Sequence, residues 1–195
     1  MGVLSNRELV AALDDRRLRI DPRPEPGPES KLSPFNASSV DLRLSADLQL
    51  PKRGLSLSFD LRTGRVAETL ATICDRHVLT ESGFVLEPNR FVLGQTIERV
   101  ELPLAGRLAA RIEGRSSFAR TGLLVHFTAP TIHPGFGKPT TGSPIALEIC
   151  NLGEWDFLLY PDMAICQLIV EVVRGKAAPT ANQFARQVNS TGASR

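Results

Sequence analysis

In the stretch Ser39-Val40-Asp41-Leu42-Arg43-Leu44-Ser45, apolar and polar side chains alternate at every step. A period of two places successive side chains on opposite faces of a strand, so this pattern is typical of a half-buried β-strand. Leu55-Ser-Leu-Ser-Phe59 repeats it. Further short apolar runs occupy Phe84–Leu86, Phe91–Ile97, Leu108–Ile112, Leu123–Phe127, Ile145–Cys150, Phe157–Leu159 and Ala164–Val173. The spacing predicts a mainly β fold, a sandwich, jelly roll or barrel, without βαβ units.

Two segments before this stretch carry other signals. Ser5-Asn-Arg-Glu8 fits a capping box, and apolar residues follow it at helical spacing, which predicts a short helix over residues 6–15. Four prolines between Pro22 and Pro28 exclude a helix or a central strand. We therefore expect an extended loop over residues 21–35.

Composition bounds the class of protein. The chain has 195 residues, of which 42% are hydrophobic, enough for one domain with a buried core. We expect that β domain to span residues 1–175, with a small, polar and flexible tail over residues 176–195. The net charge of +2 provides no attraction to nucleic acid or to a membrane surface.

Cysteine usage and the N-terminus indicate the compartment. The three cysteines, Cys74, Cys150 and Cys166, are odd in number and form no C-x-x-C pair, which argues against a disulfide framework and against a cysteine-rich zinc site. Each lies in an apolar run, so we expect buried thiols in a reducing compartment. The sequence shows no signal-peptide pattern and no apolar run near the ~18 residues of a membrane span, which favours a cytoplasmic protein.

Residues 114–122 interrupt the β pattern with one or two helical turns. Ser116 or Ser117 can cap the start of this turn, and Gly122 can end it. With Arg115 and Arg120 they offer hydroxyl, amide and guanidinium donors, which bind phosphate oxygens. The alternative is an ordinary helix start with solvated arginines, and local chemistry leaves both interpretations open.

Glu148 is a carboxylate inside the apolar run Ile145–Cys150. Such a group is costly to bury unless it is paired or catalytic, and partial burial raises its pKa toward that of a general base. The alternative is that it points to solvent.

His126 and His133 lack metal-ligand spacing, and the H-x-E and P-C-x-x-C signature of zinc deaminases is absent, so both histidines are interpreted as structural.

Several of these segments occur in the order found in one family. Glu113-Gly-Arg-Ser-Ser-Phe-Ala-Arg120-Thr-Gly-Leu is the most specific of them. The others are Leu4–Glu8, Arg19–Pro22, Ser38–Leu44, Val125–Phe136, Ala146–Glu148 and Ala164–Leu168. Over most of its length the chain resembles the dCTP deaminase branch of the trimeric dUTPase-like superfamily. The resemblance implies a distorted jelly roll with a short N-terminal helix, assembled as a homotrimer with sites between neighbours.

The resemblance also implies an activity, the conversion of dCTP and water to dUTP and ammonia. It implies Mg²⁺ bound through the triphosphate, no catalytic zinc, dTTP as a candidate inhibitor, and neither nucleic acid nor membrane as a partner. Glu148 matches the catalytic carboxylate, whereas Arg120 and Ser116 match residues that hold the attacking water and the base. The implied nucleotide-binding residues are Arg115, Ser116, Ser117, Phe118, Ala119, Arg120, Ala129, His133, Ala146, Leu147, Glu148, Gln167, Phe184 and Gln187, the last two on a tail that closes over the site.

Three departures from the family pattern keep alternatives open. His133 stands where the family usually has an Asp that contacts the deoxyribose and, in the diphosphatase branch, helps to set the hydrolytic water. The connection over residues 137–144 is longer than usual and precedes Glu148, and Gln183-Phe184 replaces the usual Lys-Tyr. One alternative is a dUTP diphosphatase or a bifunctional enzyme that makes dUMP, which His133 disfavours. The other is a nucleotide-binding regulatory trimer with little turnover.

Overall fold

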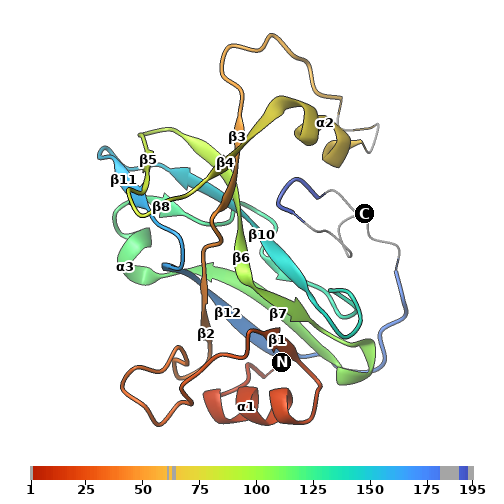
Figure 1. The fold of residues 1–195 in the computed structure, drawn as a ribbon. Helices are drawn as coiled ribbons and strands as arrows, with labels where there is room; N and C mark the ends of the chain where they lie inside the picture. The colour runs from red at the N-terminus through yellow and green to blue at the C-terminus, as the bar shows by residue number, and fades with distance from the viewer. Residues whose placement is uncertain (1, 61, 63–64, 181–188, 193–195) are drawn as a thin grey trace.

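The computed structural model describes residues 2–60, 62, 65–180 and 189–192, which form a mainly β fold with a short N-terminal helix, as predicted (Figure 1). This helix is α1, Asn6–Asp14. The Ser5 hydroxyl accepts a hydrogen bond from the Glu8 amide at 3.3 Å, and the Glu8 carboxylate accepts one from the Ser5 amide at 2.9 Å. The capping box is therefore confirmed, and it starts a helix that buries its apolar side in the core.

The larger of the sheets has six strands. Its order is β4-β3-β6-β10-β8, with β1 paired to the end of β6, and each of these pairs is antiparallel. The strands are β1 (Arg19–Asp21), β3 (Asp47–Pro51), β4 (Cys74–Val78), β6 (Phe91–Glu101), β8 (Leu123–Leu124) and β10 (Ser143–Asn151).

The second sheet has four strands in the order β2-β12-β7-β9, and a two-stranded ribbon pairs β5 with β11. The strands are β2 (Val40–Arg43), β5 (Phe84–Leu86), β7 (Leu108–Gly114), β9 (Thr131–Ile132), β11 (Phe157–Leu159) and β12 (Ala164–Val172). The alternating stretch of the sequence forms β2, with Val40 and Leu42 fully buried, which confirms the period-two prediction.

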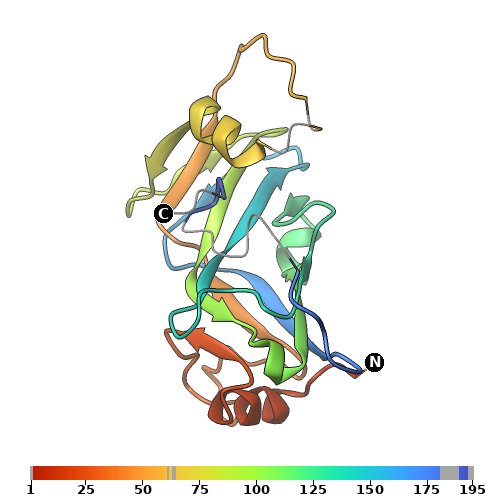
Figure 2. The ribbon, with the colours of Figure 1, turned by 90° about the vertical axis from the view of Figure 1, so that its right-hand side faces the viewer.

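One apolar core joins the two larger sheets. It includes Leu48, Leu147 and Ile149 from the six-stranded sheet and Leu42, Leu108 and Leu168 from the four-stranded sheet. Figure 2 shows α1 at one end of the molecule and α2 (Val66–Ile73) at the other. Side chains on the outer faces of the sheets do not pack in this core, so they are available to form a site.

Several segments differ from the sequence prediction, including β3, β4 and β9, which were not predicted as strands. No strand forms over Leu55–Phe59, where Leu55 and Leu57 are 52% and 54% exposed, because alternation makes no strand without a neighbour to accept its hydrogen bonds. β8 is shorter than the predicted strand, since the chain leaves β10 there and crosses to the other sheet, where β9 pairs with β7. The helix α2 was not predicted.

The three cysteines are free and buried, as the sequence predicts. Burial raises the pKa of all three thiols, so they stay protonated rather than forming reactive thiolates. Within the described part of the chain, the longest apolar helix is too short to traverse a bilayer.

Candidate active site

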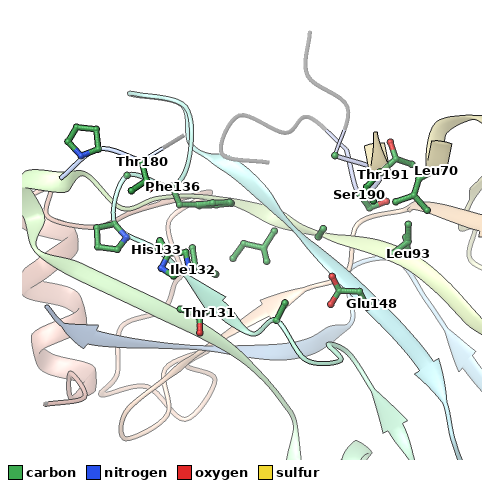
Figure 3. A pocket seen from close by; sticks show the side chains of 18 of the residues that line it. Leu70, Leu93, Thr131, Ile132, His133, Phe136, Glu148, Thr180, Ser190 and Thr191 are labelled. Carbon is green, nitrogen blue, oxygen red and sulfur yellow. The ribbon is translucent and has the colours of Figure 1, made fainter. Parts of the chain in front are cut away.

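A cavity of about 620 Å³ lies over the outer face of the six-stranded sheet (Figure 3). β6 and β10 form its floor, and α2, the segment around β9 and residues 190–192 form its walls. Most of its lining is apolar: Val66, Leu70, Phe91, Leu93, Leu104, Ile132, Phe136 and Ile145. An apolar cavity with a few converging polar groups is the usual form of a small-molecule site.

β10 places Glu148 in this cavity. The strand register sets Glu148 opposite Leu93 of β6. Because side chains alternate, Ala146 and Glu148 face the cavity, whereas Leu147 faces the core and is fully buried. Figure 3 shows the Glu148 carboxyl group at the floor, near Leu93. The side chain of Leu147, which the resemblance assigned to the nucleotide, therefore does not line the cavity.

The environment of Glu148 favours its neutral form. Burial raises the pKa of Glu148 above that of an ordinary glutamate. Hydrogen bonding from the backbone amides of Phe127 and Glu148, together with electrostatic attraction by His126, lowers the pKa by less than burial raises it. A carboxylate with a raised pKa releases and accepts protons more readily near neutral pH, which suits a general base that later acts as an acid.

His126, which the sequence interpretation treated as structural, acts electrostatically on Glu148 but does not line the cavity. Its Nε2 lies 3.6 Å from a carboxylate oxygen of Glu113, and its buried Nδ1 has no hydrogen-bond partner among the described residues. Among the residues that the structure describes, no group of three or more His, Cys, Asp or Glu side chains is arranged to hold a metal ion.

The segment that follows β9 builds the end of the cavity away from Glu148. His133 lies there beside Ile132 and Phe136 (Figure 3). Ala129, which precedes β9, also lines the cavity, so the two positions near β9 that the resemblance assigned to the nucleotide are both at the cavity wall. Residues 137–144, which the sequence suggested could reshape the pocket, do not line it.

The polar groups of the cavity are few and carry little positive charge. Besides Glu148 and His133 they are the hydroxyl groups of Thr131, Thr180, Ser190 and Thr191. The lining residues that the structure describes include no Lys and no Arg. A bound triphosphate needs cationic donors for its oxygens, so this cavity alone offers a place for the base and sugar rather than for the phosphates.

The predicted phosphate cradle lies elsewhere on the chain. It falls on and beside α3 (Ser116–Ala119), and comprises Arg115, Ser116, Ser117 and Arg120. Phe118 and Ala119, which the resemblance also assigned to the nucleotide, lie on the same helix. Figure 1 shows α3 and residues 189–192 on opposite sides of the β6–β10 pair. The expected serine cap was wrong, because the N-cap residue is Arg115 and no side chain caps the helix. Ser116 and Ser117 are both exposed.

The remaining predicted positions lie outside the cavity or outside the described residues. Gln167 is on β12, where its side chain hydrogen-bonds Asp41 of β2 rather than lining the cavity. Phe184 and Gln187 fall outside the described residues. Within one chain, therefore, the cavity brings together Ala129, His133, Ala146 and Glu148, and it excludes the α3 residues and Gln167.

Comparison with known proteins gives a consistent result. Residues 3–173 match a family model described as dCTP deaminase-like. A dUMP-forming dCTP deaminase of Methanobrevibacter smithii is 34% identical over 175 residues, which cover 89% of this chain and 81% of that protein. A dUMP-forming dCTP deaminase of Corynebacterium jeikeium is 37% identical, with 85% and 79% covered. A dCTP deaminase of Thermomicrobium roseum is 34% identical, with 90% and 82% covered.

A solved structure shares the fold. The crystal structure of 2′-deoxycytidine 5′-triphosphate deaminase from Agrobacterium tumefaciens matches with a TM-score of 0.62 at 19% identity. The match covers 88% of this chain and 48% of that one, so this chain spans about half the length of the solved chain. The likeness confirms the dUTPase-like fold class that the sequence implied.

Proposed function

The chain belongs to the dCTP deaminase-like family, and from this premise we propose that it converts dCTP and water to dUTP and ammonia. The observation that carries the proposal is the position of Glu148, a half-buried carboxylate at the floor of an apolar cavity. The cavity is large enough for a nucleoside, and its apolar walls exclude bulk water from the reacting atoms.

Glu148 carries out both proton transfers of this reaction. As a base it takes a proton from water while the water oxygen attacks C4 of cytosine, and the proton is then delivered to N3 of the ring. A second proton passes from the attached oxygen through Glu148 to the 4-amino group. The C4–N bond breaks, ammonia leaves and the C4 carbonyl of uracil forms. General acid–base catalysis of this kind contributes roughly 10² to 10⁴ in rate.

The active site is completed by a second copy of the chain in a homotrimer. The cavity lacks cationic residues in the described part of its lining, and the donors suited to a triphosphate lie on α3, outside it. Arg115 and Ser117 of a neighbouring copy would bind the triphosphate of a nucleotide whose base lies beside Glu148. Arg120 and Ser116 would hold the attacking water and the base. Contacts with the phosphates, far from C4, then position the base for attack.

Mg²⁺ would enter with the substrate. Magnesium prefers oxygen ligands and commonly binds through nucleotide phosphates with few protein ligands. This fits a site whose described residues show no cluster of metal-ligating side chains. When bound, the ion would neutralise part of the phosphate charge, and the chain's own residues would catalyse the reaction at C4.

The C-terminal tail, including Phe184 and Gln187, would close over the nucleotide, and dTTP would compete for the same site.

A second candidate activity is the formation of dUMP from dCTP. Two of the relatives above are named as dUMP-forming deaminases, which favours it. His133 disfavours it, because an imidazole stands at the cavity wall where the resemblance places the aspartate that helps to set the hydrolytic water of the diphosphatase branch. We therefore retain dUTP as the proposed product.

Separating the products of dCTP turnover distinguishes the two activities. We expect the purified protein with dCTP and Mg²⁺ to release ammonia and dUTP in equal amounts, without pyrophosphate. A coupled ammonia assay and anion-exchange chromatography of the nucleotides measure both products. Accumulation of dUMP with pyrophosphate would assign the bifunctional reaction instead, and nucleotide binding without ammonia release would indicate a regulatory protein.

The pH profile should report the ionisation of Glu148. The carboxyl group must be ionised to accept a proton, so kcat/KM should fall as the pH falls through its pKa. Because burial raises that pKa, the acid limb should lie above the ~4.3 of a free glutamate. Glu148→Asp keeps a carboxylate but changes its position, so it should shift the limb, whereas a limb due to the substrate would stay. A limb at the ordinary glutamate value would contradict this assignment.

A further inference from the structure

We infer that Asp41 is a positioning residue for the triphosphate, one that holds Arg115 through an ion pair and Gln167 through a hydrogen bond; this inference rests on the proposed function. One carboxylate oxygen of Asp41, Oδ1, accepts a hydrogen bond from Nε2 of Gln167 at 3.0 Å. The other, Oδ2, lies 3.4 Å from Nη2 of Arg115. Asp41 thus contacts two residues assigned to the nucleotide, from two different elements.

The fold brings these residues together through strand register. Gln167 of β12 lies between Asp41 of β2 and Glu113 of β7, as its direct partner on both sides. Residues paired in this way project from the same face of a sheet, so Asp41 and Gln167 both lie on its outer face. Arg115 follows β7 directly, which places its guanidinium group near the same row.

Asp41 is built into the sheet rather than loosely solvated. Its side chain is only 15% exposed. Besides the two contacts above, Oδ1 accepts a hydrogen bond from Nδ2 of Asn36 at 2.9 Å. Such a carboxylate is a fixed anchor for the more exposed Arg115, whose side chain is 34% exposed.

The geometry leaves Arg115 able to bind an anion while it is held. Nη1 donates to the backbone carbonyl of Ala164 at 3.1 Å, and Nη2 faces Asp41. A guanidinium group has five N–H donors, so others remain for phosphate oxygens. Holding a long side chain before the ligand arrives removes part of the conformational entropy cost of binding, which raises affinity without a new ligand contact.

The consequence is a specific kinetic defect in Asp41→Asn. This substitution keeps an oxygen that can accept from Gln167 but removes the charge that attracts Arg115. Releasing one side chain of this kind should raise the KM and calorimetric Kd for dCTP by about 10-fold, with kcat little changed. Asp14→Asn makes the same chemical change at an exposed carboxylate that pairs with Arg23, away from this cluster, and should leave both constants near the wild-type values. Asp41→Glu retains a carboxylate and should restore part of the affinity.

A double substitution separates positioning from a general loss of structure. If Asp41 acts through Arg115, then Asp41→Asn combined with Arg115→Gln should bind dCTP no more weakly than Arg115→Gln alone. Additive losses, or a wild-type KM and Kd in Asp41→Asn, would refute the positioning role. Thermal denaturation measures whether each variant is folded. If Asp41→Asn does not fold, Asp41→Glu replaces it in the double-mutant cycle with Arg115→Gln, and the cycle still measures the coupling between the two positions.

The outcomes also separate this inference from the proposed function. If the wild-type protein turns over dCTP and Asp41→Asn behaves like it, the inference fails and the function stands. If the wild-type protein binds dCTP without releasing ammonia, the proposed reaction fails, while the calorimetric cycle still decides the role of Asp41. If the wild-type protein neither binds nor deaminates dCTP, both fail.

Discussion

Glu148→Gln should lower kcat for dCTP deamination by roughly 10² to 10⁴-fold, the contribution expected of general acid–base catalysis. The amide has nearly the volume of the carboxyl group, so the cavity keeps its shape. It cannot accept a proton from water, and therefore neither the attack at C4 nor the departure of ammonia is assisted. We expect the Kd for dCTP to change little, because the proposed phosphate contacts lie on α3 and not on β10. Ammonia release and calorimetric titration measure the two effects separately.

Glu154→Gln is the matched control for this substitution. Glu154 is an exposed carboxylate that does not line the cavity, so the same chemical change there should leave turnover intact. Full deamination by Glu148→Gln would remove the basis of the proposed function. A parallel loss of dCTP binding in Glu148→Gln would mean that the residue holds substrate rather than transferring protons.

Sequence patterns predict the fold well where burial and residue type are linked directly. In β2 the alternation places Val40 and Leu42 in the core, and in α1 the side chains of Ser5 and Glu8 themselves satisfy the first backbone amides. The same patterns say nothing about whether a strand has a neighbour. Leu55–Phe59 alternates as clearly as β2, yet it forms no strand, because a strand's hydrogen bonds depend on a partner that is distant in the sequence.

The helix α2 shows a second limit. It has no fully buried residue, and its Val66 and Leu70 line the cavity instead of the core. Val66, Leu70 and Ile73 do follow the i, i+4, i+7 spacing of one helix face. The helix is only eight residues long, however, and its N-cap residue, Arg65, is not of a type that signals a helix start. The helix can be placed only once the sheet that carries the cavity floor is known.

In the candidate site, too, some residues can be recognised from the sequence and others only from the structure. Glu148 stands out in the sequence as a lone carboxylate in an apolar strand, but that pattern alone leaves open whether it enters a site or points to solvent. His126 gives no such signal, since its approach to Glu113 and to Glu148 depends on how the chain crosses from β8 to β9. The only sequence feature that could have pointed to it is its place within the segment Val125–Phe136. The separation of α3 from the cavity is also invisible in the sequence, because it depends on how the sheets place the two segments in the folded chain.

Mixed trimers should recover activity that neither parent protein has. One parent carries Glu148→Gln, and the other carries Arg115→Ala with Ser117→Ala, which removes charge-assisted donors to the phosphates. With dCTP below its KM we expect each parent to lose on the order of 10²-fold or more in rate. If each site takes Glu148 from one copy and Arg115 with Ser117 from another, random mixing in equal amounts should give about a quarter of all sites both wild-type contributions, and about a third of the sites in trimers that contain both parents.

Activity recovers only if Glu148 of one chain and Arg115 of another act on the same nucleotide, so the experiment tests directly whether two copies share each site. If Glu148 and Arg115 of the same chain served one nucleotide, every chain in the mixture would still carry a defect, and mixing would give only the parental background. The parents, tagged differently and co-expressed, can be purified through both tags so that only mixed assemblies are assayed. Mixing Glu148→Gln with itself under two tags is the control for the purification. Because the described lining of the cavity holds the carboxylate but no cation, recovery by a neighbour's arginine would explain how a cavity without positive charge can accept a triphosphate.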